Sequence, residues 1–439
     1  MERTQDFTRG GIFAPLVRFA LPVLLAMFLQ TMYGAVDLLV VGQFARSADV
    51  SAVSTGSQIM MTVTLVINSL AMGLTVLVAR SIGAGQPKRA GGIIGTGLWL
   101  FGVLSVVVSG AMVLLSPALA RLMRAPAEAF SGTVTYIRIC SAGAVFIVAY
   151  NLVGSIFRGI GDSRMPLITV AIACGLNIAG DLLLVAVFRM AAAGAALATV
   201  FAQAVSVLLS VVIIRRRKLP FSLGREERRP RGEHIRGILR LGIPIALQDL
   251  LVSISFLVIL AIVNSLGVIA SAGVGVAEKL CGFVMLVPSA FMQSISAFVA
   301  QNMGAGKPER ARRALGCGIL ASLTVGILMA WLNFFHGDLM AGIFARDRDV
   351  ILAGAEYLKA YAIDCLLVSF LFCFIGYFNG RGNTIFIMLQ GILGAFFVRI
   401  PISWWMSRQV PVSLFHIGLA TPASTTVQIL LCGVFSSFV

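Results

Sequence analysis

Charged residues are scarce in this chain. They make up 12% of its 439 residues, whereas hydrophobic residues make up 59%. Soluble domains carry about 25% charged residues, so this shortage, with a mean hydropathy of +0.97, excludes an ordinary soluble domain. Apolar runs of roughly 20 residues, the length that crosses a bilayer, instead predict a polytopic membrane protein.

Histidine is also rare, and the cysteines are not paired. The three histidines are separated in sequence, and none of the seven cysteines forms a CxxC pair, so neither a zinc site nor a disulfide framework is indicated. The chain also has no phosphate-binding loop and no nucleophile-elbow pattern. These absences argue against a membrane-embedded enzyme, and we expect no cofactor beyond a coupling ion.

Acidic residues are outnumbered, 18 against 34 basic ones, which gives a net charge of +16. The placement of the basic residues explains this excess. With an inside N-terminus, 23 of the 34 fall on the cytoplasmic side, as the positive-inside rule requires. We therefore expect a cell-membrane protein with both termini in the cytoplasm, surrounded by lipid, without a nucleic-acid partner and acting as a monomer.

The chain contains the same half twice. Val78 to Leu98, VARSIGAGQPKRAGGIIGTGL, matches Val299 to Ile319, VAQNMGAGKPERARRALGCGI, 221 positions later. Phe157 to Ser163 matches Phe378 to Thr384 at the same displacement. The apolar runs number six per half, and an even number makes the repeats parallel. The predicted fold is therefore an all-α membrane protein of twelve transmembrane helices, with lobes at 1–214 and 237–439 joined by a basic, solvated linker at 215–236.

Ionisable residues inside membrane spans are costly and therefore mark candidate functional sites. In the first half these are Asp37 and Asp181. Asp181 and Thr199 each lie 9 residues from the turn near position 190, and Asp37 lies at a similar depth. Tyr33 and Asn177 stand one helical turn from Asp37 and Asp181. This oxygen-rich group predicts a site for Na⁺ or H⁺; the alternative is a polar cluster that ties helices together.

These residues and turns resemble those of the multidrug and toxic compound extrusion (MATE) transporters. The resemblance covers the whole chain and includes the GAG-x-P-x-R and F-x-G-x-G turns in both halves. It implies that Asp37, Tyr33, Asn177, Asp181 and Thr199 bind Na⁺ or H⁺, and that this binding drives export of organic cations, drugs or amphipathic metabolites. A lipid-linked precursor flippase of the same superfamily is the alternative. Pro22 interrupts the hydrogen bonding of the first helix and is therefore a candidate hinge; the alternative is a static kink.

The second half holds different chemistry. Asp249, Glu278, Asp364 and Arg399 form a candidate charge network there. One branch of the family places acids in the seventh and tenth helices, but Asp249 and Asp364 lie a few residues away from those positions, so no family role is carried over to them. Arg399 and Asp364 fall at nearly one depth, and we expect Arg399 to pair with Asp364 or Asp249.

Overall fold

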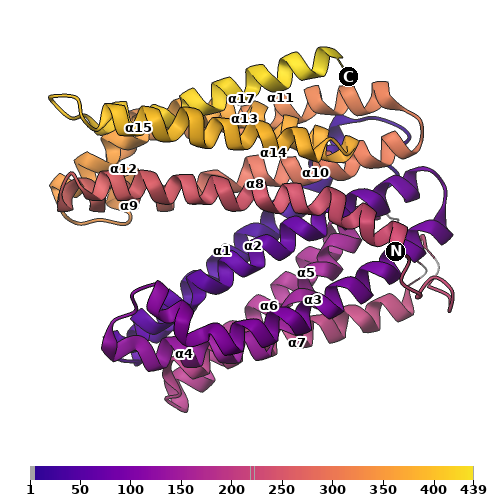
Figure 1. Ribbon diagram of the computed structural model, residues 1–439, viewed down its shortest axis with the longest axis horizontal. Helices are drawn as coiled ribbons and strands as arrows, with labels where there is room; N and C mark the ends of the chain where they lie inside the picture. Colours follow the sequence, from indigo (N-terminus) through magenta and orange to yellow (C-terminus); the bar gives the residue numbers. More distant parts are fainter. Residues whose placement is uncertain (1–4, 218, 222, 439) are drawn as a thin grey trace. The chain divides into compact units, whose positions relative to one another are not determined.

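The computed structural model describes residues 5–217, 219–221 and 223–438, and in these residues every regular element is helical (Figure 1). The first half comprises α1 Phe13–Phe44, α2 Ser47–Gly83, α3 Pro87–Leu122, α4 Ala127–Ala142, α5 Ala144–Gly159, α6 Arg164–Asp181, the π-helical turn η1 Leu182–Val187 and α7 Ala191–Arg216. The second comprises α8 Gly232–Asn264, α9 Val268–Val284, α10 Leu286–Gly304, α11 Pro308–Phe335, α12 Gly337–Gly342, α13 Arg348–Arg381, α14 Thr384–Ile392, η2 Leu393–Arg399, α15 Ile400–Met406, α16 Leu414–Gly418 and α17 Ala420–Phe438.

The predicted number of spans is confirmed. Within the described residues, 11 segments are long and apolar enough to cross a membrane, and the pair α4 and α5, bent by 55°, completes 12. The matching GAG turns between α2 and α3 and between α10 and α11 have the same backbone geometry in both halves. Gly85 and Gly306 adopt φ values of +67° and +68°, and Pro87 and Pro308 begin the next helices.

The chain divides into two compact units whose limits differ from the sequence lobes. Unit 1 contains Met1–Asp6 and Leu25–Ala246, and unit 2 contains Phe7–Leu24 and Leu247–Val439. The first parts of α1 and α8 are therefore exchanged between the halves. Both crossing points lie just after a helix proline, Pro22 in α1 and Pro244 in α8. Because proline removes a helical hydrogen bond, these are places where each helix bends at low cost.

The start of α8 joins unit 1 through close backbone packing on α2. A Cβ atom on Gly242 would lie 2.5 Å from the carbonyl oxygen of Leu70, and one on Gly73 would lie 2.6 Å from that of Ile238. Small residues let membrane helices approach in this way, and dispersion contacts then stabilise them where lipid gives no hydrophobic driving force. Ile238, fully buried, extends the core formed by Leu74, Ile94 and Phe157.

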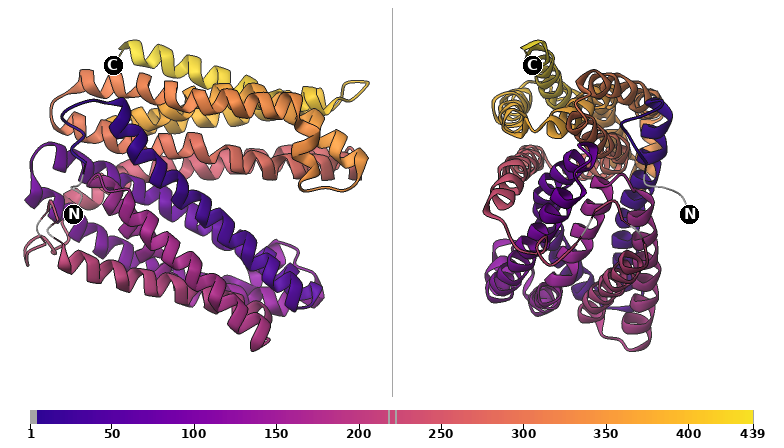
Figure 2. Two further views of the ribbon diagram at one scale, coloured as in Figure 1. Left: turned by 180° about the vertical axis from the view of Figure 1, so that it is seen from behind. Right: turned by 90° about the vertical axis from the view of Figure 1, so that its right-hand side faces the viewer.

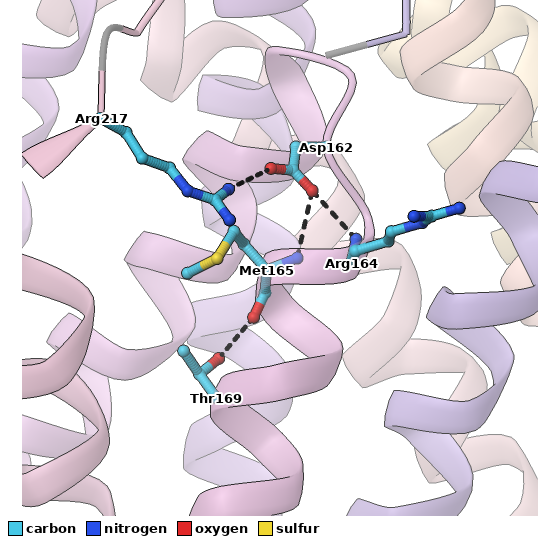
Figure 3. A network of polar contacts seen from close by, with 5 residues as sticks. All are labelled: Asp162, Arg164, Met165, Thr169 and Arg217. Carbon is cyan, nitrogen blue, oxygen red and sulfur yellow. Dashed lines mark hydrogen bonds and ion pairs between the residues drawn. The ribbon is translucent and has the colours of Figure 1, made fainter. Parts of the chain in front are cut away.

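The basic linker between the halves packs on unit 1 through its apolar residues. Its apolar side chains at Leu219, Phe221 and Leu223 pack on the core of unit 1, while its arginines remain exposed. Arg217, the first residue after α7, forms an ion pair with Asp162 at 3.4 Å. Figure 3 shows that Asp162 also accepts from the backbone amides that open α6, at 3.0 and 3.1 Å. Alternate apolar residues therefore attach the linker to unit 1.

We predict that Gly242→Ala lowers the stability of the purified protein by about 1–3 kcal/mol, because the added methyl group overlaps a backbone carbonyl that cannot move aside. Thermal unfolding in detergent measures this change. Gly175→Ala is the matched control, since nothing lies within 4 Å of a Cβ atom there. Equal melting temperatures for the two variants would contradict the close α2–α8 packing.

A candidate cation site in unit 1

Three helices of unit 1 bring the candidate residues together. Asp37 lies in the C-terminal part of α1, Asp181 is the last residue of α6, and Thr199 lies on α7. The π-helical turn η1 begins directly after Asp181. Such turns widen the helix locally and occur often at functional sites, because they change the direction of the side chains beside them. The helices α6 and α7 run side by side in Figure 1, as expected for a tight hairpin.

The polar atoms of this group form one connected cluster. The Thr199 hydroxyl lies 3.4 Å from Asp37 Oδ2 and 3.0 Å from the carbonyl oxygen of Ala195. Asn177 donates through Nδ2 to Thr199 Oγ1 at 3.3 Å. Asp181 lies within hydrogen-bonding reach of the Asp37 carboxylate. The structure therefore assembles the four predicted ligands from residues up to 162 positions apart.

The two carboxylates are buried without enough hydrogen-bond donors. Asp181 has 0% and Asp37 5% of its surface exposed. In the described part of the chain, no group donates to either oxygen of Asp181, to Asp37 Oδ1 or to Asn177 Oδ1. Two negative charges that face each other under these conditions are very costly, unless a proton or a metal cation neutralises one of them.

The donor set fits a monovalent cation. Carboxylate, amide and hydroxyl oxygens are hard ligands, which suit Na⁺ and equally suit a proton shared between two acids. No cluster of three or more His, Cys, Asp or Glu side chains occurs among the described residues, so a site for a multivalent metal held by such side chains is absent there. The residues that would hold Na⁺ are Asp37, Asn177, Asp181 and Thr199.

A small cavity adjoins the acids, one helical turn away. It is lined by Tyr33, Tyr150, Ala173, Asn177, Thr199, Ala202 and Gln203. Tyr33 contacts Gln203, and Gln30 donates to the Tyr150 hydroxyl at 3.4 Å. Tyr33 is predicted from the sequence, whereas Tyr150 and Gln203 are not. The signal for Gln203 was its place one turn after Thr199, matching Tyr33 before Asp37 and Asn177 before Asp181.

In unit 2 the candidate charge network is partly assembled. Arg399, the last residue of η2, donates through Nη1 to Ser255 Oγ at 3.1 Å, and its guanidinium lies 4.3 Å from the Phe256 ring centre. Asp364, 1% exposed, contacts Thr425, and it attracts Arg399 at longer range. Tyr357 lies close to Glu278, Asp364 and Arg399.

The expected direct ion pair of Arg399 is not formed. Within the described residues, no carboxylate oxygen lies within 4.0 Å of its guanidinium, because Ser255 and the Phe256 ring occupy that position instead. The prediction of a pair with Asp364 or Asp249 is thus wrong as to contact, although Asp364 remains the neighbouring opposite charge. Asp249 lies on α8, where its carbonyl accepts from Ser253 at 2.8 Å, and its membership of the network stays a prediction.

Comparison with known proteins agrees with the duplicated architecture. A family model described as MatE matches residues 22–183 and again residues 244–405. The chain belongs to the MatE family. The two matches are displaced by 222 residues and start at Pro22 and Pro244, which confirms that the halves are repeats. This MatE protein is a multi-pass membrane protein by the length and composition of its helices.

Relatives of this MatE protein include the probable multidrug resistance protein YpnP of Bacillus subtilis, 27% identical over 412 residues, which are 93% of this chain and 92% of the relative. The multidrug export protein MepA of Staphylococcus aureus is 24% identical over 396 residues, 89% of this chain and 88% of the relative.

Two solved structures share the fold. One is the outward-facing conformation of a multidrug resistance MATE family transporter of the MOP superfamily, with a TM-score of 0.92, 20% identity, and coverage of 100% of this chain and 98% of that one. The other is a MOP superfamily transporter from Pyrococcus furiosus, described as having a binding pocket of reverse polarity, with a TM-score of 0.93, 20% identity and the same coverage.

We predict that Asp37→Asn and Asp181→Asn each reduce efflux at least tenfold while the protein stays folded. Each substitution also removes a buried negative charge that has too few hydrogen-bond donors, and so removes its desolvation cost. The melting temperature of each variant should therefore stay the same or rise, by an amount that corresponds to about 1 kcal/mol of stability. Drug efflux from cells and thermal unfolding measure the two effects. Asp338→Asn, at an exposed acid, is the control. A large loss of stability would mean that the acids tie helices together.

Proposed function

We propose that this protein is an antiporter that couples inward movement of Na⁺ or H⁺ to export of organic cations, drugs or amphipathic metabolites. The observation that supports this proposal is the buried Asp37–Asp181 pair, which lacks donors on three of its carboxylate oxygens. A static helix tie would be satisfied internally, whereas this pair needs a mobile positive charge. Family membership supports the efflux part of the proposal.

The mechanism follows from the electrostatics of the pair. Without a cation, the Asp37 and Asp181 carboxylates repel each other in a medium of low dielectric constant, and this disfavours close packing of α1 against α6. A bound proton or Na⁺ removes the repulsion and favours the close arrangement. A cation changes a conformational equilibrium only by its difference in affinity for the two arrangements, and this repulsion supplies such a difference.

Each residue then has a defined part. Asp37 and Asp181 carry the negative charges, and Thr199 and Asn177 supply neutral oxygens and hold the carboxylates in register. Tyr33 lines the cavity together with Asn177 and Thr199. All of these residues belong to unit 1, so one chain carries the whole cation site. The proposed transporter therefore acts as a monomer without a cofactor, which a mass determination in detergent checks.

The decisive experiment uses purified protein in liposomes with an imposed gradient and ethidium as the fluorescent organic cation. We expect an imposed pH gradient or an imposed Na⁺ gradient to drive ethidium in the direction opposite to the flow of the cation. Ethidium transport should stop when that gradient collapses. The gradient that drives transport identifies the coupling ion. If neither gradient drives ethidium, and a lipid-linked pyrophosphate reporter is moved instead, the protein is a flippase and the antiport proposal fails.

We also propose that both termini and the linker face the cytoplasm, because 23 of the 34 basic residues then lie inside. Single cysteines at Gln86, Glu227 and Glu309, in a background without other cysteines, should resist an impermeant thiol reagent in intact cells and react in inverted vesicles. Labelling of Glu309Cys alone from outside the cell would show that the repeats are inverted, which contradicts the parallel arrangement.

A further inference from the structure

The short segment that precedes α1, Phe7–Gly11, is held in unit 2 by one arginine. Arg310 donates from Nε to the carbonyl of Phe7 at 2.9 Å and from Nη1 to that of Gly10 at 2.6 Å. Its Nη2 donates to the carbonyls of Arg9 and Gly11, each at 2.9 Å. Figure 2 shows this indigo segment beside the orange turn between α10 and α11. Arg310 thus uses its fork of donors on four backbone acceptors.

Two further side chains near Arg310 also bind this segment. Lys307 Nζ donates to the Thr8 carbonyl at 2.8 Å, and Asn302 Nδ2 donates to that of Phe7 at 3.1 Å, so every carbonyl from Phe7 to Gly11 is bound by a side chain of this turn. The Phe7 ring is 0% exposed, with its centre 5.1 Å from that of Phe19 and 5.0 Å from that of Phe298. We call Phe7–Gly11 with Asn302, Lys307 and Arg310 the latch.

The turn itself does not require this use of the arginine. Arg89 holds the same place in the first copy of the motif, 221 positions earlier, and the α2–α3 turn has the same geometry. The Arg89 side chain is exposed and donates to Gln86 Oε1 at 3.4 Å, within its own turn. The latch is therefore a property of the second copy and not of the motif.

The latch controls where α1 is held. Residues Phe7–Leu24 belong to unit 2, whereas Leu25–Phe44, which include Tyr33 and Asp37, belong to unit 1. A movement of the C-terminal part of α1 at the cation site can bend the helix near Pro22 only if its start is fixed. If the N-terminal end of α1 is not attached, the whole helix can move as a rigid body. A movement at Asp37 then produces no bend near Pro22.

We propose that Arg310 is a positioning residue for transport, which fixes the start of α1 so that cation binding at Asp37 and Asp181 is converted into bending between Pro22 and Leu25. This inference rests on the proposed antiport function. It predicts a separation of two properties: without Arg310 the protein still binds the cation but does not use it for export.

The test compares Arg310→Ala with the matched Arg89→Ala in the full-length protein. Trypsin cleavage after Arg9, followed by intact mass, reports whether the latch is open. We expect this cleavage to be about tenfold faster or more in Arg310→Ala. Each hydrogen bond from a charged donor lowers the population of the detached, cleavable segment by roughly that factor. Gradient-driven ethidium transport should fall at least tenfold in Arg310→Ala and stay at the wild-type level in Arg89→Ala.

Cation binding is measured separately, as the rise in melting temperature on adding Na⁺ at fixed pH or on lowering the pH at fixed Na⁺. This rise should persist in Arg310→Ala and vanish in Asp37→Asn. Arg310→Lys, which keeps the charge but not the fork, covers the case in which alanine prevents folding, and should show intermediate cleavage and transport.

Three results would overturn the inference: wild-type transport with an open latch, equal loss of transport in both arginine variants, or loss of the cation-dependent melting shift in Arg310→Ala. Failure of the antiport proposal itself looks different. In that case Asp37→Asn transports normally, or neither gradient drives ethidium in the wild-type protein, whatever the state of the latch.

Discussion

Two carboxylates that face each other inside a membrane protein, with too few donors around them, constrain the rest of unit 1. Three helices must meet at one depth to place Asp37, Asp181 and Thr199 together, and a π-helical turn begins directly after Asp181. Lipid offers no water to compensate the charges, so the protein has to obtain a cation or accept a large penalty. That demand is the physical basis of the proposed cation binding.

The two halves began as copies but now use the shared frame differently. The first half places two acids where a cation is needed, while the corresponding part of the second half carries Arg399, a permanent cation that donates to Ser255 and lies on the Phe256 ring. Each of these charged centres adjoins a π-helical turn, η1 after Asp181 and η2 ending at Arg399. A local change of helical register thus accompanies buried charge in both halves.

The first part of α1 belongs to unit 2, and the first part of α8 belongs to unit 1. Each start is attached to its unit by different chemistry. For α8 it is the close contact of Gly242 with Leu70, which excludes even a methyl group, and for α1 it is the Arg310 fork on a row of carbonyls. Both attachments hold the helix on the N-terminal side of a proline, the position at which a helix bends at lowest cost.

The sequence by itself determined the membrane class, the twelve spans, the duplication and the residues of the candidate cation site, because span length, repeat spacing and the cost of buried charge are local properties that can be read along the chain. It also identified Asp37 and Asp181 by depth, since both can be counted from nearby turns. Only the tertiary structure decided which unit each half-helix joins, that Arg399 meets Ser255 and not a carboxylate, that the linker packs on unit 1, and that Arg310 but not Arg89 grips a backbone segment. These outcomes depend on which side chains from distant parts of the chain come into contact in the folded structure. The depth of a residue in the membrane does not specify the side of the helix on which its side chain lies.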